Sequence, residues 1–339
     1  MVGLKIGIDL GTSTFRAYVE GKGIVLSEPS VIAIDREDGS VAAVGLRAHE
    51  MIGKAPQVYK VIKPIEGGSV VDYDMAQLML GIFFDKICKN KVFKPTVAAC
   101  MPSGITALEQ RTLLQLFLTA GTGRICLFEQ PLAAAIGAGI VLDKPFGTMI
   151  IDIGSGTTDL AVVTMGSTAV SYCIKTGSEL LNKNIIDYLR INRGILIGEK
   201  TAEELKLQLG GAVRREEEIA AVSRGKSVED GMPFYFEVTA NEINLAIKDS
   251  IESICKSVLS VLEITPPELL KDITESGIIL SGAASRLFGL DKLISEYTSI
   301  KTTVVAEPET VVVKGLGKAL RNIEYLKQQG YVFKTFEDL

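Results

Sequence analysis

The sequence predicts an α/β protein built from two similar domains. Apolar, strand-like runs alternate with amphipathic helical segments along the chain, a pattern typical of mixed sheets covered by helices. A short motif of Asp, Gly and hydroxyl residues occurs twice, about 140 residues apart, and such an internal repeat indicates two related halves. The length of 339 residues is more than one hydrophobic core usually fills and fits two domains.

The first copy of the motif lies near the N-terminus, in KIGIDLGTSTF. An apolar run leads to Asp9, a turn of small residues follows, and a second strand-like run, FRAYVEGKGIVL, comes next. The turn contains Gly11, Thr12, Ser13 and Thr14. We therefore predict a β-hairpin with an open turn that is rich in backbone N–H groups and hydroxyls.

The second copy is DIGSGTTD, which follows the apolar run MII and precedes LAVVTMGSTAVSYCI. After Asp152 the turn contains Gly154, Ser155, Gly156 and Thr157. A tight turn needs only one or two residues able to take positive φ, so the additional small residues indicate a ligand rich in acceptor oxygens. The alternative is a pair of unrelated hairpin turns.

If the two turns converge on one cleft, their N–H groups can hold successive phosphates, as backbone nests do. Asp9 and Asp152 would then hold a hydrated Mg²⁺, because this ion keeps most of its waters and takes few carboxylates. The two motifs together therefore predict a nucleotide site between the halves.

The remaining elements follow from periodicity and capping signals. Asp74 is a candidate cap for the helix 74–90, and Thr106 with Glu109 predicts a capping box. Small residues over 125–139 indicate a strand running into a helix that packs closely against its neighbours. The other predicted elements are a strand at 97–103, helices at 106–121, at 201–210 and at 239–264, the last two each opening with Thr and a Glu three residues on, and a strand, turn and helix over 276–297.

Composition excludes several classes of protein. The net charge of −5 gives no electrostatic case for nucleic acid as a partner. Five widely spaced cysteines without a CxxC motif indicate buried thiols in a reducing cytosol, and the single His49 disfavours histidine-based metal or triad chemistry. The N-terminus has no signal-peptide pattern, and no apolar run is long enough to span a bilayer. We therefore expect a cytoplasmic protein.

Several stretches resemble, in order and over nearly the whole chain, the MreB/Mbl family of bacterial actin-like cell-shape proteins. The resemblance implies an actin-like (ribonuclease H-like) fold, with two similar α/β domains around an ATP cleft and a smaller subdomain on each. The stretches are GIDLGTSTF, GKGIVLSEPSVIAID, EQPLAAAIGAG, DIGSGTTDLAV, IGEKTAEELK and TPPEL with GIILSGAASRLFGLDKLI. The expected boundaries are 1–32, 70–142 and 315–339 for domain IA, 33–69 for subdomain IB, 143–180 and 240–314 for domain IIA, and 181–239 for subdomain IIB.

The same resemblance implies a function. Family members polymerise with ATP into filaments on the inner face of the cytoplasmic membrane, where they guide cell-wall synthesis and maintain rod shape. The implied partners are the protein itself, the membrane and the cell-wall synthesis and shape proteins. Two alternatives remain open: a paralogue that assembles, or modulates another filament, without turnover, and a chaperone-type ATPase, which the short chain after the nucleotide region disfavours.

Carried over residue by residue, the resemblance implies a specific site. Gly11 to Thr14 and Gly154 to Thr157 bind the phosphates, and Asp9 and Asp152 surround Mg²⁺. Glu203 and Lys206 face the ribose and adenine, and Gly282 with Ala283 forms the turn on which the adenosine stacks. Gln130, Thr157 and Asp152 form the catalytic set. Without the resemblance, Glu203 and Lys206 read as an ordinary i,i+3 surface pair.

The sequence departs from the family pattern in three motifs. Ser155 replaces a glycine of DIGGGTTD, and Ala283 and Ala284 replace glycines of the adenosine turn, which would introduce strain if either site needs positive φ. Gln130 replaces the second glutamate of Glu-Glu-Pro, the residue that positions the attacking water. An amide orients a water without accepting its proton, so we expect slow hydrolysis. Actin has glutamine at the corresponding place and still hydrolyses ATP once polymerised.

The segment KNKVFKP places Val92 and Phe93 between lysines, after an amphipathic helix. Family members carry a pair of apolar residues in this loop that enters the bilayer. The alternative is a small buried anchor for the loop. Two apolar side chains supply only a few kcal/mol, so a single subunit would bind weakly and a filament through many such loops.

Overall fold

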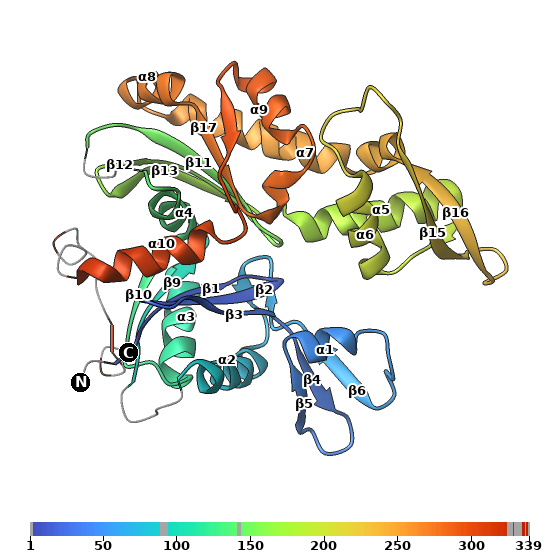
Figure 1. The fold of residues 1–339 in the computed structure, drawn as a ribbon, viewed down its shortest axis with the longest axis horizontal. Helices are drawn as coiled ribbons and strands as arrows, with labels where there is room; N and C mark the ends of the chain where they lie inside the picture. Colours follow the sequence, from blue (N-terminus) through green and yellow to red (C-terminus); the bar gives the residue numbers. More distant parts are fainter. Residues whose placement is uncertain are drawn as a thin grey trace.

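A computed structural model of the chain describes residues 3–88, 94–140 and 144–323, together with residues 328, 334, 335 and 337. Two five-stranded sheets form the centre of the molecule, one in each half, and helices cover them (Figure 1). Within the described residues, no helix is long and apolar enough to cross a membrane.

The first sheet has the strand order β10-β9-β1-β2-β3. β1 runs antiparallel to β2 and parallel to β9, and this arrangement places the first Asp-Gly-hydroxyl turn between β1 and β2. Helices α2 (Tyr73–Ile87) and α3 (Ala107–Thr119) pack on this sheet and share a buried core with it. The strands are β1 (Lys5–Leu10), β2 (Thr14–Val19), β3 (Gly23–Pro29), β9 (Thr96–Met101) and β10 (Arg124–Glu129).

The second sheet repeats this topology. Its order is β13-β12-β11-β17-β18, with β11 antiparallel to β12 and parallel to β17, so β11 corresponds to β1 and β12 to β2. Its strands are β11 (Thr148–Ile153), β12 (Thr158–Thr164), β13 (Ser167–Ile174), β17 (Ile278–Ser281) and β18 (Thr302–Val304), and its helices α7 (Ala240–Ile264), α8 (Pro267–Ser276) and α9 (Leu290–Thr298). The predicted internal repeat is therefore confirmed. The second turn lies between β11 and β12, the strands that correspond to β1 and β2 on either side of the first turn.

Two helices, α4 (Gln130–Ala138) and α10 (Val311–Ala319), lie between the sheets and join the halves (Figure 1). Their backbones approach so closely that an added Cβ at Gly137 would collide with the carbonyl of Val311, and one at Gly315 with that of Ala133. The small-residue helix predicted after β10 thus packs closely, as expected. A buried cluster that includes Phe128, Ile150 and Leu316 continues through both sheets.

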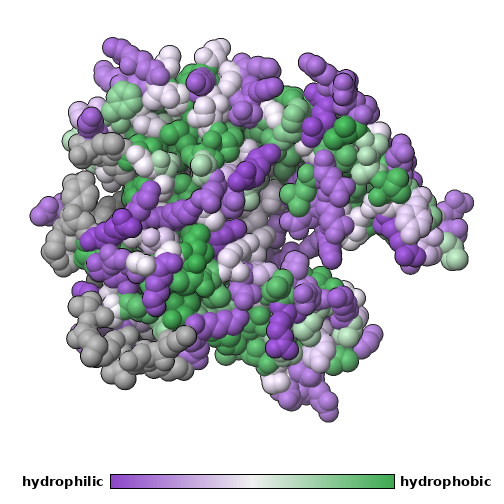
Figure 2. Space-filling view, in the orientation of Figure 1, coloured by the Kyte–Doolittle hydropathy of each residue, from purple (hydrophilic) through white to green (hydrophobic). Residues whose placement is uncertain are grey.

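Each half carries a smaller lobe. One contains the sheet β5-β4-β6 and α1, and the other the sheet β14-β15-β16 with α5 and α6 (Figure 1). Figure 2 shows the surface notched between the two lobes. The elements are β4 (Ile32–Asp35), β5 (Val41–Val44), α1 (Leu46–Glu50), β6 (Tyr59–Ile62), α5 (Ser178–Arg193), β14 (Ile195–Leu196), α6 (Glu199–Leu209), β15 (Ala220–Ser227) and β16 (Pro233–Thr239), with the short β7 (Ile65–Glu66), β8 (Ser69–Val70), η1 (Ala283–Arg286) and η2 (Leu320–Asn322) elsewhere.

The helix starts test the capping predictions. The capping boxes at Thr106 and Thr239 are both present. The predicted cap at Asp74 is wrong, because the side chain of Asp72 accepts the hydrogen bond from Met75 N and Asp74 lies in the first turn. The predicted start at Thr201 is also wrong: α6 begins at Glu199 after Gly198, without a side-chain cap, so Thr201 lies inside the helix.

Candidate functional site

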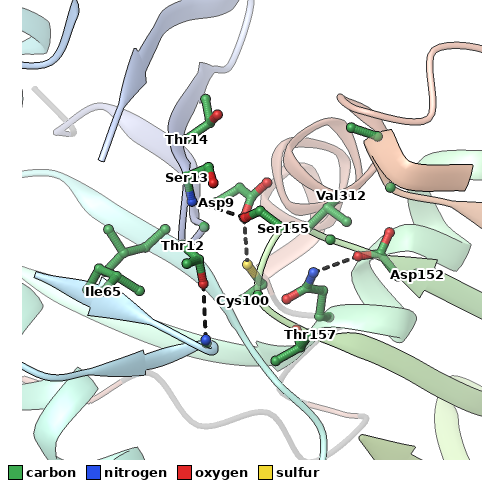
Figure 3. Close-up of a pocket in the computed structure, with 18 of the residues that line it drawn as sticks. Asp9, Thr12, Ser13, Thr14, Ile65, Cys100, Asp152, Ser155, Thr157 and Val312 are labelled. Atoms are coloured by element: carbon green, nitrogen blue, oxygen red, sulfur yellow. Dashed lines mark hydrogen bonds between the residues drawn. The ribbon is translucent and has the colours of Figure 1, made fainter. Parts of the chain in front are cut away.

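The two Asp-Gly-hydroxyl turns face each other across one pocket between the halves (Figure 3). Every predicted site residue among the described residues lines this pocket except Lys206. The lining residues include Asp9, Gly11, Thr12, Ser13, Thr14, Gln130, Asp152, Gly154, Ser155, Gly156, Thr157, Glu203, Gly282 and Ala283. The predicted site residues in the pocket are separated by up to 274 positions in the sequence, from Asp9 to Ala283.

The two turns have the same internal geometry and touch each other. Gly11 N donates to Thr14 O at 3.1 Å, and Gly154 N donates to Thr157 O at 2.9 Å, so each turn is closed by the equivalent bond. Across the cleft, Ser13 N donates to Ser155 Oγ at 3.0 Å (Figure 3). An added Cβ at Gly156 would collide with the hydroxyl of Thr12, so the second turn needs glycine there.

The departures from glycine are accommodated without backbone strain. Neither Ser155 nor Ala283 has a positive φ, and in the adenosine turn the left-handed conformation is taken by Gly282, at a φ of 81°. A Cβ at Gly282 would also collide with the carbonyl of Ile153. The strain considered for Ser155, Ala283 and Ala284 is therefore absent, because these residues do not occupy the positions that require glycine.

Asp9 and Asp152 occupy equivalent positions in the two sheets, and each accepts a hydrogen bond from the neighbouring parallel strand. Cys100 Sγ, in β9, donates to Asp9 Oδ1 at 3.3 Å, and Ser281 Oγ, in β17, donates to Asp152 Oδ1 at 2.5 Å. Arg16 lies 3.9 Å from the other oxygen of Asp9. The repeat therefore extends to the residues that orient the two carboxylates.

Burial perturbs both carboxylates. It raises the pKa of Asp152 to about 7, against the lowering effect of hydrogen bonds from Ser281 and Gln130. Burial also raises the pKa of Asp9, although Arg16 opposes the shift. A cation between the two would favour their ionised forms. Among the described residues no group of three or more His, Cys, Asp or Glu is placed to hold a metal ion. Two carboxylates alone suit Mg²⁺, because this ion keeps several waters or phosphate oxygens as its other ligands.

The two predicted water-positioning groups are both held by buried aspartates. Gln130, the first residue of α4, donates from Nε2 to Asp152 Oδ2 at 2.6 Å. Thr157 donates from Oγ1 to Asp159 Oδ2 at 2.9 Å. One N–H of the Gln130 amide and the hydroxyl proton of Thr157 are thus used within the protein, and the amide and hydroxyl oxygens remain as acceptors.

α6 and the η1 turn carry the residues predicted to face the adenosine. Glu203 is exposed at the pocket, whereas Lys206 is 8% exposed and its Nζ donates to Ser178 O at 3.2 Å. Burial lowers the pKa of Lys206, opposed by Glu203 and Glu179. The alternative of an ordinary surface pair does not describe Lys206, because its side chain is buried. Val92 and Phe93 lie outside the described residues.

Sequence reasoning missed the second layer of the site. Asp159 is the last residue of the quoted DIGSGTTD, and closing that hairpin pairs it with Asp152, so the motif itself contained the signal. Cys100 and Ser281 lie on strands distant in the sequence from the carboxylates they contact, and no motif indicated them.

Comparison with known proteins places the chain in a family. The family model described as "MreB/Mbl protein" matches residues 3–328. The chain belongs to the MreB/Mbl family. Its two sheets and the pocket between them form an actin-like fold.

Individual relatives span the same length. The cell shape-determining protein Mbl of Bacillus cereus is 38% identical over 329 residues, which is 96% of this chain and 98% of Mbl. The cell shape-determining protein MreB of Escherichia coli is 38% identical over 325 residues, 94% of each chain. The crystal structure of MreB5 of Spiroplasma citri bound to AMPPNP has a TM-score of 0.91 at 31% identity, covering 97% of this chain and 99% of MreB5, and the ADP-bound structure has a TM-score of 0.89.

Proposed function

We propose that this protein binds ATP with Mg²⁺ and polymerises into a cytoskeletal filament. The observation that carries the proposal is the convergence of two equivalent turns and two equivalent buried carboxylates on one pocket between the halves. The proposal is supported by MreB5 of Spiroplasma citri, a member of the same family, which has been solved with ADP and with AMPPNP.

In this proposal the backbone N–H groups of residues 11–14 and 154–157 bind the phosphates. Asp9 and Asp152 would hold Mg²⁺, and the ion would neutralise charge on the phosphates. Glu203 and Lys206 border the ribose and adenine, and the adenosine stacks on the turn at Gly282. The buried Lys206 also holds the start of α5 through Ser178 O, so it fixes the pocket wall.

Hydrolysis is the second part of the proposal. Gln130 and Thr157 orient the attacking water, each through an acceptor oxygen, and position 130 carries an amide where the family has a glutamate. We therefore propose slow turnover within the filament. The candidate without turnover, a paralogue that assembles or modulates another filament, is favoured by the same glutamine, because its amide is committed to Asp152.

The third part concerns the cell. We propose that the filaments lie at the inner face of the cytoplasmic membrane, act with cell-wall synthesis and shape proteins, and help to maintain rod shape. Support comes from Mbl and MreB, both named as cell shape-determining proteins. The family match over residues 3–328 disfavours a chaperone-type ATPase.

Phosphate release and pelleting at rising protein concentration test the function. We expect no pelleting without nucleotide, pelleting above a critical concentration with ATP and Mg²⁺, and phosphate release that begins with assembly. Pelleting without phosphate release would favour the paralogue without turnover. Absence of both nucleotide binding and assembly would contradict the whole proposal.

Attachment to membranes is tested by flotation with liposomes. Replacement of Val92 and Phe93 by Ser is expected to leave filaments that pellet normally but no longer float with anionic liposomes. The parent protein in added salt is a second control, because salt screens the attraction of the lysines to anionic lipid and should weaken flotation. A lower melting temperature and impaired assembly would indicate a buried anchor instead. Equal flotation of variant and parent would contradict membrane attachment through these residues.

A further inference from the structure

The hydroxyl of Thr157 has a fixed direction. Thr157 lies in the second turn, directly before β12, is 5% exposed and lines the pocket. Its single hydroxyl proton is donated to Asp159 Oδ2, 2.9 Å away. Asp159 is fully buried, and its other oxygen accepts the backbone N–H of Ser103 at 2.6 Å. Thr157 Oγ1 is therefore left with lone pairs only, and it is a hydrogen-bond acceptor.

The side-chain oxygen of Gln130 is also left as a hydrogen-bond acceptor. Its Nε2 faces Asp152 Oδ2 at 2.6 Å, and an amide next to a carboxylate must present its nitrogen, so Oε1 is left as an acceptor. Both residues approach Gly154: an added Cβ there would lie 3.3 Å from the backbone oxygen of Thr157 and 3.9 Å from Gln130 Nε2. Both side chains line the pocket beside one glycine of the proposed phosphate turn, and a water has two hydrogens to donate.

We propose that Asp159 is a positioning residue for ATP hydrolysis, which holds the Thr157 hydroxyl proton so that the hydroxyl oxygen accepts a hydrogen bond from the attacking water. With its hydrogens on Thr157 and Gln130, the water directs a lone pair away from both and toward the phosphate. Asp159 does not touch the substrate and acts through Thr157. This inference rests on the proposed hydrolysis and adds a residue to it.

Asp159→Asn tests the direction of the bond. Ser103 N–H still requires an acceptor, so the asparagine keeps its Oδ1 there and presents Nδ2 to Thr157. The new donor occupies the lone pair of the hydroxyl and turns its proton toward the cleft. We expect the single-turnover rate in assembled protein to fall roughly tenfold, the rate equivalent of one ordinary hydrogen bond, with the affinity for a fluorescent ATP analogue unchanged within about threefold.

A double-mutant cycle separates positioning from support of the fold. Thr157→Val removes the hydroxyl and keeps the shape, so it is expected to lose a similar factor, while Thr157→Ser keeps the rate. In Thr157→Val/Asp159→Asn no further loss is expected, because the hydroxyl is no longer there to be misdirected. A structural role for Asp159 predicts instead that the two losses multiply, since the contact with Ser103 is disturbed in either background.

Asp272→Asn is the matched control, because Asp272 also accepts a backbone N–H, that of Gly147 at 2.8 Å, away from the pocket. Its rate is expected to equal that of the parent. Asp159→Ser serves as a second variant if Asp159→Asn is unfolded at the assay temperature. It removes the carboxylate that holds the Thr157 hydroxyl proton, and it is expected to show the same loss of rate.

The outcomes distinguish this inference from the function beneath it. Hydrolysis by Asp159→Asn at the parent rate would overturn the role of Asp159 and leave the proposed function intact. Losses that multiply in the double-mutant cycle would have the same consequence. A parent that binds nucleotide without turnover would remove both the proposed hydrolysis and the role of Asp159.

Discussion

The side-chain amide of Gln130 donates a hydrogen bond to the carboxylate of Asp152, with 2.6 Å between Nε2 and Oδ2. Gln130 begins α4 directly after the last strand of the first sheet, and Asp152 lies in β11 of the second, so the bond joins the two halves beneath the pocket. It also links the residue that replaces the family's glutamate to a proposed Mg²⁺ ligand. In the proposed site, a change at position 130 would therefore act on metal binding as well as on the water.

Gln130→Glu is expected to raise the single-turnover hydrolysis rate in assembled protein, because a carboxylate can accept the proton of the attacking water. The new carboxylate would face Asp152 at hydrogen-bonding distance, and two buried carboxylates share a proton, which raises the pKa of one of them. The rate advantage over the parent should therefore grow as the pH rises from 6 to 8.5. Phosphate release after mixing with substoichiometric ATP measures it.

Asp152→Ala, tested at the same protein concentration, gives the opposing control, since it removes a proposed metal contact and should abolish hydrolysis. An unchanged rate for Gln130→Glu in assembled protein, at every pH, would show that the water is not limited by the residue at position 130.

Asp152→Asn is expected to stabilise the nucleotide-free protein. The pKa of Asp152 is about 7 in the fold and near 3.8 in an unfolded chain, so the folded state holds the extra proton between these values and stability falls as the pH rises through that window. Asparagine does not titrate. Each pKa unit is worth about 1.4 kcal/mol, so the gain in Tm should be present at pH 6 and larger at pH 8. Thermal unfolding in EDTA measures it.

The same variant should fail to assemble with ATP and Mg²⁺, because the amide cannot supply the anionic ligand. Higher stability with lost function would mark Asp152 as a residue kept for binding at a cost to the fold. Normal pelleting of Asp152→Asn would contradict its role at the metal, and a Tm gain that is equal at both pH values would contradict the raised pKa.

The hairpin motifs and the close-packed helix were predictable because they depend on local chemistry. An Asp at the end of an apolar strand, followed by glycines and hydroxyls, specifies both the turn and its N–H groups. Ser281 was not predictable, because it meets Asp152 through a parallel strand pairing between residues 129 positions apart. Contacts between the lobes, such as that of Lys63 with Glu199, depend on how two separate cores are docked, and periodicity carries no information on docking.

Ser155→Ala is expected to tighten ATP binding several-fold. In the structure Ser155 Oγ accepts the N–H of Ser13, a donor that the phosphates need in the proposed site. Removing the hydroxyl frees that donor, and a hydrogen bond of this kind is worth about 1 kcal/mol. Alanine keeps the Cβ, so the backbone gains no freedom that would offset the effect. Titration with a fluorescent ATP analogue measures the affinity, and Ser155→Gly shows the added cost of a flexible backbone.

Weaker binding by Ser155→Ala would contradict this prediction and would indicate that the Ser155 hydroxyl contacts the nucleotide itself. A parallel titration with ADP shows which phosphate uses the donor. If only the terminal phosphate uses the N–H of Ser13, Ser155→Ala should change the affinity for ATP and leave the affinity for ADP unaltered.

Lys63 connects the two lobes across the cleft. It follows β6 in one lobe, and its Nζ lies 2.9 Å from Glu199 Oε2, at the start of α6, and 3.4 Å from Glu179 Oε1, at the start of α5. Glu179 Oε1 also accepts the hydroxyl of Ser13, at 3.0 Å, so the ion pairs are coupled to the first phosphate turn. Burial would lower the pKa of Lys63, but the two glutamates outweigh it and the pKa is raised. The lysine therefore stays charged and holds the lobes together.

Lys63→Met is expected to speed the release of bound nucleotide, because the cleft opens more readily without these ion pairs. Partly exposed ion pairs are worth about 0–1 kcal/mol each, so the release rate should rise roughly two- to fivefold. Added salt should speed release from the parent by screening the same contacts and have less effect on the variant. Lys60→Met, an exposed lysine on β6, is the matched control for lost charge and should behave as the parent. Release from Lys63→Met at the parent rate and with the parent's salt dependence would show that closure does not depend on Lys63.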